Sequence, residues 1–335
     1  MPFSETQLQR ARRLLCRLQD DVRAALVAAR GRGGRLARVA GVTAADTIYA
    51  VDRVSERTVL DWFHREWPRA WPVELVMEGL PGKGSATFPA RTPVARTKWK
   101  CIIDPIDGTR GLMYDKRSGW SLAALAPQRG PATSLEDIVV AAMTELPGAK
   151  AGAADQYSAV RGGGVVAERV DLCTGERRRF APRPSRAREV AHGFASVVKF
   201  FPAGKSWLAG LEEELWRELD AGEDVFDDQY MSTGGQMHEL LTGRDRFIAD
   251  LRPLAAERLG LRSALACHPY DIGAALIARE AGCVVVGPDG GPLRAPLDTT
   301  TPVAWVGYAN PALARTIGPA LRRVLRRAMR PRRRR

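Results

Sequence analysis

The sequence lacks the features that hold small secreted proteins and membrane proteins together. Its five cysteines are an odd number, and none forms a C-x-x-C pair, which argues against a disulfide framework and against a structural zinc site. No apolar run approaches the roughly 18 residues of a membrane span, and the amino-terminal segment is polar. These absences favour a reducing compartment, so we expect a cytoplasmic protein that has no membrane partner.

Positive charge is concentrated at one end of the chain. The formal net charge is +13, but nine arginines lie within 322–335, which leaves +4 for all the residues before them. The body therefore has the charge balance of an ordinary soluble enzyme, and its 45% hydrophobic residues suffice for a buried core. We expect 322–335 to be a disordered basic tail that binds polyanions weakly and without specificity.

Hydrophobic periodicity predicts an α+β first half and an α/β second half. A chain of 335 residues exceeds one ordinary core of about 100–200 residues, so we expect two subdomains, 1–185 and 186–321, followed by the tail. The apolar spacing and the turn residues predict the following elements: helices over 4–30, 52–67, 206–219, 236–241 and 272–281, and strands over 73–77, 99–103, 120–126, 138–144, 157–160, 165–170, 189–201, 246–250, 283–286 and 303–308.

One segment combines a buried-type strand with acidic residues. The strand over 99–103 runs into Asp104-Pro-Ile-Asp-Gly-Thr109, which places two carboxylates at a strand end. The proline fixes one φ angle, so Asp104 and Asp107 can converge with the Ile106 carbonyl on one point, and an all-oxygen cluster suits a hard cation. Gly108 allows close backbone approach, and the amides after it would bind phosphate if a helix begins there. The alternative is that this segment is only a type I turn.

The segment 103–109 closely resembles a signature of the inositol monophosphatase family, the lithium-sensitive, metal-dependent phosphatases. Three further stretches resemble family motifs in the family's order, over roughly residues 40 to 310. Residues 46–52 are similar to D-x-V-T-x-x-D, with Asp52 on its second aspartate. Glu78 lies on the first glutamate of G-E-E, and residues 268–275 with 280–282 are similar to W-D-x-A-A-G…E-A-G-G, with Asp271 on its aspartate.

The resemblance implies a layered αβαβα sandwich and a metal centre. One Mg²⁺ would be held by Glu78, Asp104 and the Ile106 carbonyl, and a second by Asp104, Asp107 and Asp271. A third, weaker ion would use Asp52, and Mn²⁺ could replace Mg²⁺. Metal-activated water would then hydrolyse a small phosphate monoester.

The resemblance also implies roles for the residues around the metals. Glu78, Asp104 and Thr109 would be catalytic, with Glu78 and the Thr109 hydroxyl orienting the attacking water. The phosphate would be received by the amides of Gly108 and Thr109. The full set of residues expected to bind the substrate is Gly108, Thr109, Arg110, Asp250 and Asp271. Inositol monophosphate, sugar bisphosphates, 3′-phosphoadenosine 5′-phosphate and histidinol phosphate all remain open as substrates. Lithium inhibition and a homodimer are further expectations.

The sequence departs from the family pattern at several positions. Gly79 replaces the second glutamate of G-E-E, Tyr270 replaces the tryptophan, and an insertion lies within 251–267. Each motif also has a structural alternative: Asp271 could be only a helix N-cap, and Glu78 a solvated strand end. The alternative function is a catalytically weak relative that acts as a nucleic-acid or protein binding module through its basic tail.

Overall fold

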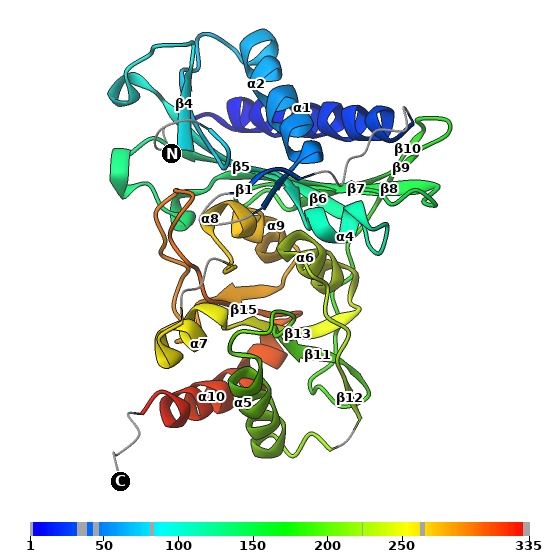
Figure 1. Cartoon of the computed structure of the whole chain (residues 1–335), viewed down its shortest axis with the longest axis vertical. Coiled ribbons are helices and arrows are strands. Elements are labelled where there is room, and N and C mark those ends of the chain that lie inside the picture. Colours follow the sequence, from blue (N-terminus) through cyan, green and yellow to red (C-terminus); the bar gives the residue numbers. More distant parts are fainter. Residues whose placement is uncertain are drawn as a thin grey trace.

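Helices and sheets alternate in five layers along the long axis of the molecule (Figure 1). The computed structural model describes residues 3–31, 39–42, 47–80, 84–222, 224–261 and 265–330. Asp46 and the last five residues lie outside these ranges. From one end to the other the layers are helical, sheet, helical, sheet and helical, so the predicted αβαβα sandwich is confirmed.

The first layer consists of two long helices, α1 (Glu5–Gly31) and α2 (Ala50–Glu66). The capping pattern predicted at the start of α1 is present: the Ser4 amide donates to Gln7 Oε1 at 2.8 Å, and the Gln7 amide donates to Ser4 Oγ at 3.3 Å. Leu15, Leu18 and Val22 recur at helical spacing and are buried. This apolar stripe packs α1 onto the first sheet, and α2 packs on both α1 and that sheet.

The second layer is an eight-stranded sheet whose strand order is β10-β9-β8-β7-β6-β5-β3-β4. All neighbours are antiparallel except β3 and β5, which are parallel. Its strands have the following bounds: β3 (Val73–Met77), β4 (Ser85–Phe88), β5 (Trp99–Asp107), β6 (Gly119–Pro127), β7 (Val140–Leu146), β8 (Ala153–Val160), β9 (Val165–Asp171) and β10 (Arg177–Phe180). The six strands predicted in this half are present, whereas β4 and β10 were not predicted.

The fourth layer is a five-stranded sheet in the order β12-β11-β13-β15-β14. It comprises β11 (Gly193–Val197), β12 (Val225–Phe226), β13 (Asp245–Asp250), β14 (Val284–Val286) and β15 (Trp305–Tyr308). The chain passes from one sheet to the other between Phe180 and Gly193, and we propose the predicted boundary near 185 as the division between two subdomains. A separate hairpin pairs β1 (Val39–Val42) with β2 (Thr47–Tyr49).

The middle layer lies between the two sheets and carries short helices (Figure 1). These are α4 (Thr109–Met113), α6 (Thr233–Thr242), α8 (Pro269–Ile272) and α9 (Ala275–Glu280). Helix α6 packs on β6 on one side and on β13 on the other, and α9 packs on both β8 and β14. Loops at the ends of both sheets therefore meet in this layer.

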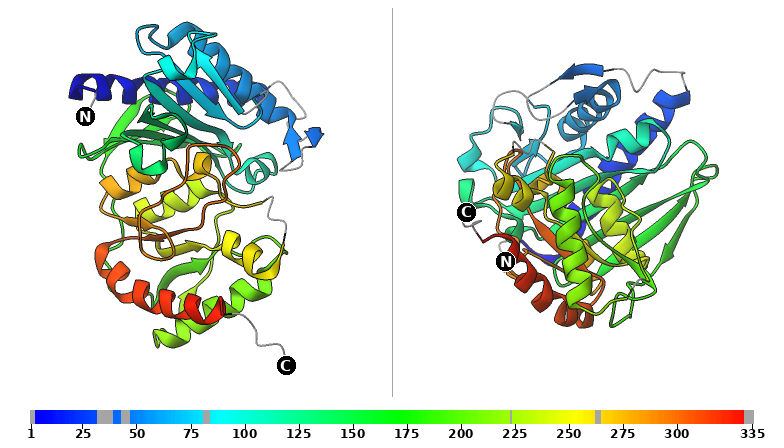
Figure 2. Two further views of the ribbon diagram at one scale, coloured as in Figure 1. Left: turned by 90° about the vertical axis from the view of Figure 1, so that its left-hand side faces the viewer. Right: turned by 60° about the horizontal axis from the view of Figure 1, so that its bottom comes forward.

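The outer layer pairs α5 (Lys205–Glu218) with α10 (Pro311–Ala328), at the end of the molecule farthest from α1 (Figure 2). The expected disorder of 322–335 is wrong for 322–328, because these residues continue α10. Val324 and Leu325 are buried against the second sheet's core, which fixes this part of the helix. Residues 331–335 lie outside the described part of the chain.

Two other predicted elements differ from the structure, and one helix was not predicted. The strand expected over 189–201 is limited to β11, which ends at Val197. The helix expected over 272–281 is present as α9, and α8 is a separate short helix before it. The insertion within 251–267 contains an additional helix, α7 (Arg252–Leu259). No helix within the described ranges offers a stretch both long and hydrophobic enough to traverse a bilayer.

Candidate active site

A bulge at the end of β5 brings two aspartates to the same side of the sheet. Asp104 pairs with Leu122 of β6 and Asp107 pairs with Trp120, so three steps along β5 are opposed by two along β6. Residues three apart in a regular strand point to opposite faces, and one extra residue removes that difference. The turn alternative for this segment is therefore wrong: β5 continues to Asp107, and α4 follows directly after Gly108.

Asp271 completes an acidic cluster from the other side of the pocket. One carboxylate oxygen from each of Asp104, Asp107 and Asp271 lies within 4.8 Å of the others. Asp271 is the third residue of α8, where its Oδ2 accepts a 2.6 Å hydrogen bond from the His268 amide. The N-cap itself is His268, so the interpretation of Asp271 as an N-cap is wrong, although it does support the start of that helix.

The three carboxylates repel one another, as the pKa values of two of them show. Burial, followed by the charges of Asp107, Asp271 and Glu78, raises the pKa of Asp104 well above its ordinary value. Burial and Asp271 likewise raise the pKa of Asp107, although the amide of Gly234 donates to its carboxylate. A site of this kind favours either protonation or a cation.

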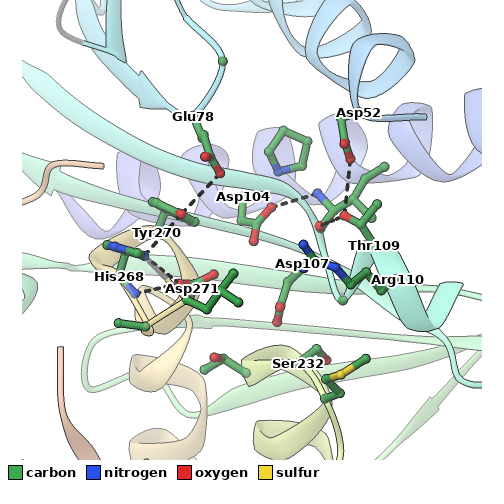
Figure 3. Close-up of a pocket in the computed structure, with 18 of the residues that line it drawn as sticks. Asp52, Glu78, Asp104, Asp107, Thr109, Arg110, Ser232, His268, Tyr270 and Asp271 are labelled. Atoms are coloured by element: carbon green, nitrogen blue, oxygen red, sulfur yellow. Dashed lines mark hydrogen bonds and ion pairs between the residues drawn. The ribbon is translucent and has the colours of Figure 1, made fainter. Parts of the chain in front are cut away.

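Glu78 follows β3 and contacts Tyr270 of α8 (Figure 3). The hydroxyl of Tyr270 donates to Glu78 Oε2 at 3.2 Å, and it lies 3.3 Å from His268 Nδ1. The rings of His268 and Tyr270 are stacked, with centroids 5.3 Å apart. Tyr270 therefore holds the Glu78 carboxylate beside Asp104.

Thr109 links Asp52 to the end of β5 (Figure 3). Its hydroxyl lies 2.9 Å from the Ile106 carbonyl oxygen and 3.3 Å from Asp52 Oδ1, and both of these atoms are acceptors. The Ile106 amide in turn donates to Asp104 Oδ1 at 2.9 Å. Gly108 precedes α4 with φ +83°, and a Cβ there would lie 2.8 Å from that of Ser232, so only glycine fits without displacement.

Arg110 also lines the pocket, at the start of α4 (Figure 3), but Asp250 does not. The Asp250 side chain is fully buried behind the pocket wall, where it accepts hydrogen bonds from Arg252 Nε at 2.8 Å and from Arg252 Nη2 at 2.5 Å. Arg252 lines the pocket instead, with its guanidinium 4.9 Å from the ring centroid of Phe200 and 5.4 Å from that of Phe201. Asp250, which was expected to bind the substrate, therefore does not line the pocket and contacts Arg252, which does.

The predicted site residues thus meet at one pocket, apart from Asp250. Asp104, Asp107 and Asp271 form the compact cluster, and Glu78 and Asp52 line the same pocket outside it. The donor set consists of carboxylate and carbonyl oxygens, and neither thiolates nor imidazoles belong to the cluster. Such a set, with like charges in close contact, fits Mg²⁺ or Mn²⁺ better than zinc.

Several residues of the pocket were not predicted from the sequence, among them Glu56, Phe200, Phe201 and Arg252. The sequence contained a signal that could have predicted Arg252 as a pocket residue, because Arg252 lies two residues after an aspartate at a strand end. Phe200 and Phe201 fell within a segment predicted as strand. Glu56 had no signal of its own, because only the folded chain places it beside Gly79.

The layer order and the pocket together define a fold class, that of inositol monophosphatase-like structures. Solved structures confirm the resemblance found in the sequence at the level of the fold. The chain is similar to the extragenic suppressor protein SuhB from Bartonella henselae, with TM-score 0.62 and 17% identity over 92% of this chain and 97% of that one. It is also similar to fructose-1,6-bisphosphatase from Leishmania major, with TM-score 0.63 and 17% identity over 92% and 93% of the two chains.

A third similar structure is the inositol monophosphatase (IMPase) from Thermotoga maritima, with TM-score 0.59 and 15% identity over 96% of this chain and 99% of that one. No protein-family model and no curated protein matches the sequence. The likeness therefore concerns the fold, and the chemistry rests on the residues of the pocket.

Proposed function

We propose that this protein is a Mg²⁺-dependent phosphatase that hydrolyses a small phosphate monoester. The observation that carries the proposal is the meeting of Asp104, Asp107 and Asp271 directly beside the start of α4. This arrangement combines a cation site with backbone amides suited to an anion. Phosphatases among the solved structures of the same fold support it.

Each residue of the pocket has a role in this proposal. Glu78, Asp104 and the Ile106 carbonyl would hold one Mg²⁺, and Asp104, Asp107 and Asp271 a second. Bound divalent cations supply Lewis-acid chemistry, which makes water more acidic and offsets charge on phosphoryl and leaving-group oxygens.

The attacking water would be oriented by Glu78 and Thr109. The hydrogen of the Thr109 hydroxyl is donated toward Ile106 O and Asp52. The lone pairs of this hydroxyl can therefore accept a hydrogen bond from the attacking water. Asp52 and Ile106 thereby fix the direction in which Thr109 can act.

The phosphate would be received by the amides of Gly108 and Thr109, with Arg110 as an additional contact. Arg252 and the two phenylalanines form the part of the wall that would meet the alcohol portion of the substrate. Mn²⁺ as a substitute metal, inhibition by lithium and a homodimer belong to the same proposal.

A panel of phosphate monoesters, assayed for released inorganic phosphate with and without Mg²⁺, tests the activity. Asp104→Asn and Asp271→Asn should each lower kcat/KM by about 100-fold or more, because each removes a ligand while keeping the shape of the side chain. Asp61→Asn, at an exposed position of α2, is the matched control and should keep full activity. Wild-type rates in either site variant would refute the assignment.

A further inference from the structure

Two segments that line the pocket leave the second sheet at the same edge. Phe200 and Phe201 follow β11, and Arg252 begins α7 two residues after the last residue of β13. Because β11 and β13 are parallel neighbours, their carboxyl ends lie side by side, where open sheets commonly bind ligands. The two phenylalanines and Arg252 all line the pocket that holds the acidic cluster.

The guanidinium of Arg252 packs against both aromatic rings. Its central carbon lies 4.9 Å from the ring centroid of Phe200 and 5.4 Å from that of Phe201. The two rings meet edge to face, with centroids 4.9 Å apart and an interplanar angle of 71°. Both phenylalanines are half-buried, so their rings are held by these contacts and still border the cavity.

Arg252 is itself fixed, and its charge is balanced. Its Nε and Nη2 donate to the two carboxylate oxygens of Asp250, at 2.8 and 2.5 Å, and its Nη1 donates to the Leu265 carbonyl at 2.6 Å. Asp250 is fully buried, and only 13% of the Arg252 side chain is exposed. These contacts hold the guanidinium against the rings, and the ion pair has no net charge with which to attract a second phosphate.

This part of the wall suits a flat, unsaturated ring better than a polyol. Polyol hydroxyls are recognised by hydrogen bonds, and both oxygens of the Asp250 carboxylate are already engaged by Arg252. Hydroxyls buried against Phe200 and Phe201 would lose their partners in water without gaining others. An aromatic ring on the same surface has no such cost, and stacking stabilises it beyond the effect of buried area.

We propose that Phe200 and Phe201, held by Arg252, form a subsite for a flat ring, and that the substrate is a phosphate monoester of an alcohol that carries an aromatic or heteroaromatic ring. This inference rests on the proposed function, since it assigns the alcohol portion of the same substrate. It favours, among the substrates that the sequence leaves open, those with a heteroaromatic ring over inositol and sugar phosphates.

Two phosphonates that differ only in their ring test the proposal without turnover. Phenylpropylphosphonate and cyclohexylpropylphosphonate have a carbon in place of the ester oxygen, so neither is hydrolysed, and they share charge and chain length. The saturated ring has at least as much apolar surface, so buried area alone would favour it or leave the two equal. Isothermal titration of the full-length protein in Mg²⁺ should give the phenyl compound the lower Kd, by about three- to tenfold.

Leucine variants test whether the two phenylalanines cause this preference. Phe200→Leu and Phe201→Leu should each reduce it, because leucine keeps apolar surface and removes the aromatic ring. Phe201→Tyr keeps a ring and should retain the preference. Phe226→Leu, at an exposed position of β12 outside the pocket, is the matched control and should bind both compounds as the wild type does. Titration with methylphosphonate, which has no ring, checks that each variant keeps its fold and its phosphoryl site.

Two results would overturn the ring subsite: equal or tighter binding of the cyclohexyl compound by the wild type, or an unchanged preference in both leucine variants. The phosphatase proposal is decided by a different measurement. A preference for the phenyl compound that the leucine variants lose, with no phosphate released by the wild type from any ester, would keep the ring subsite and refute the phosphatase. Phosphate release without a preference for the phenyl compound would keep the phosphatase and refute the ring subsite.

Discussion

The Asp250–Arg252 pair is the part of the pocket wall where one side chain most clearly depends on another. Asp250 is fully buried and meets two guanidinium nitrogens of Arg252, whose Nη1 also donates to the Leu265 carbonyl at 2.6 Å. Burial disfavours the charged form of Arg252, but the charge of Asp250 outweighs this and raises its pKa. The guanidinium is thus fixed as a cation in the wall of the pocket.

Replacing Arg252 should therefore destabilise the fold as well as alter the pocket. We expect Arg252→Met to lower the free energy of unfolding by about 3–5 kcal/mol, because it leaves the Asp250 carboxylate buried without a counter-charge. Urea unfolding at neutral pH measures the change. The double variant Asp250→Asn/Arg252→Met should recover part of the loss, and a loss equal to the sum of the two single changes would show that the pair is not coupled.

The acidic cluster could be predicted from the sequence, whereas several other residues of the pocket could not. Asp104, Asp107 and Asp271 were found because their motifs are contiguous. The reason that Asp104 and Asp107 share a side was not found, since it depends on a bulge set by pairing with β6. Glu56 and Arg252 were missed because their positions in the pocket follow from packing between elements distant in sequence.

Helix α10 joins the arginine-rich end of the chain to the core. Arg323 and Arg327 pair with Glu218, and Arg327 also pairs with Glu214, so part of the basic charge is balanced by α5. These pairs are partly exposed and contribute little by themselves. The buried side chains of Val324 and Leu325 are the stronger reason that the helix continues through this segment.

Two truncations distinguish the contribution of α10 to stability from the effect of the terminal positive charge. Deleting 322–335 should lower the free energy of unfolding by roughly 3–6 kcal/mol, because it removes two buried aliphatic side chains at about 1.5–3 kcal/mol each. Deleting only 331–335 should leave thermal unfolding unchanged, and it isolates any effect of the terminal charge on RNA retention. Equal melting temperatures for the two truncations, measured by circular dichroism, would contradict the assigned packing of α10.

Elements with a strong apolar pattern were predicted well, and those shaped by contacts were not. The strands of the first sheet alternate with clear turn signals, and α1 has an uninterrupted apolar stripe. Helix α7 was missed, although Pro253 near its start and Gly260 after its end are typical helix boundaries. The strand predicted over 189–201 was too long because Phe200 and Phe201 are apolar for another reason: they pack against Arg252.

Across the whole molecule, the site is assembled from both sheets and the helices between them. Asp104 and Asp107 come from the first sheet, Asp271 from the middle layer and Arg252 from the end of the second sheet. Holding like charges close together in this way lowers the stability of the folded state. The packing of the layers on either side of the site must offset that loss. A cation that offsets these charges would therefore stabilise the entire fold and not only the pocket.

This coupling predicts that stabilisation by Mn²⁺ increases with pH. The pKa values of Asp104 and Asp107 are raised in the fold, so without cation the folded state binds more protons than the unfolded state above the ordinary aspartate pKa, and its stability falls as pH rises. Mn²⁺ requires the ionised carboxylates and displaces those protons. The increase in melting temperature at a fixed Mn²⁺ concentration should thus be larger at pH 8 than at pH 5.5.

Asp104→Asn provides the comparison for this prediction. Without Mn²⁺ it should unfold at a higher temperature than the wild type, by an amount that corresponds to about 0.5–2 kcal/mol, because it removes one of three repelling charges. With Mn²⁺ its melting temperature should rise little at either pH. A Mn²⁺ effect on the wild type that is the same at pH 5.5 and pH 8 would mean that protons do not compete with the cation at Asp104 and Asp107, and that Mn²⁺ binds elsewhere on the protein.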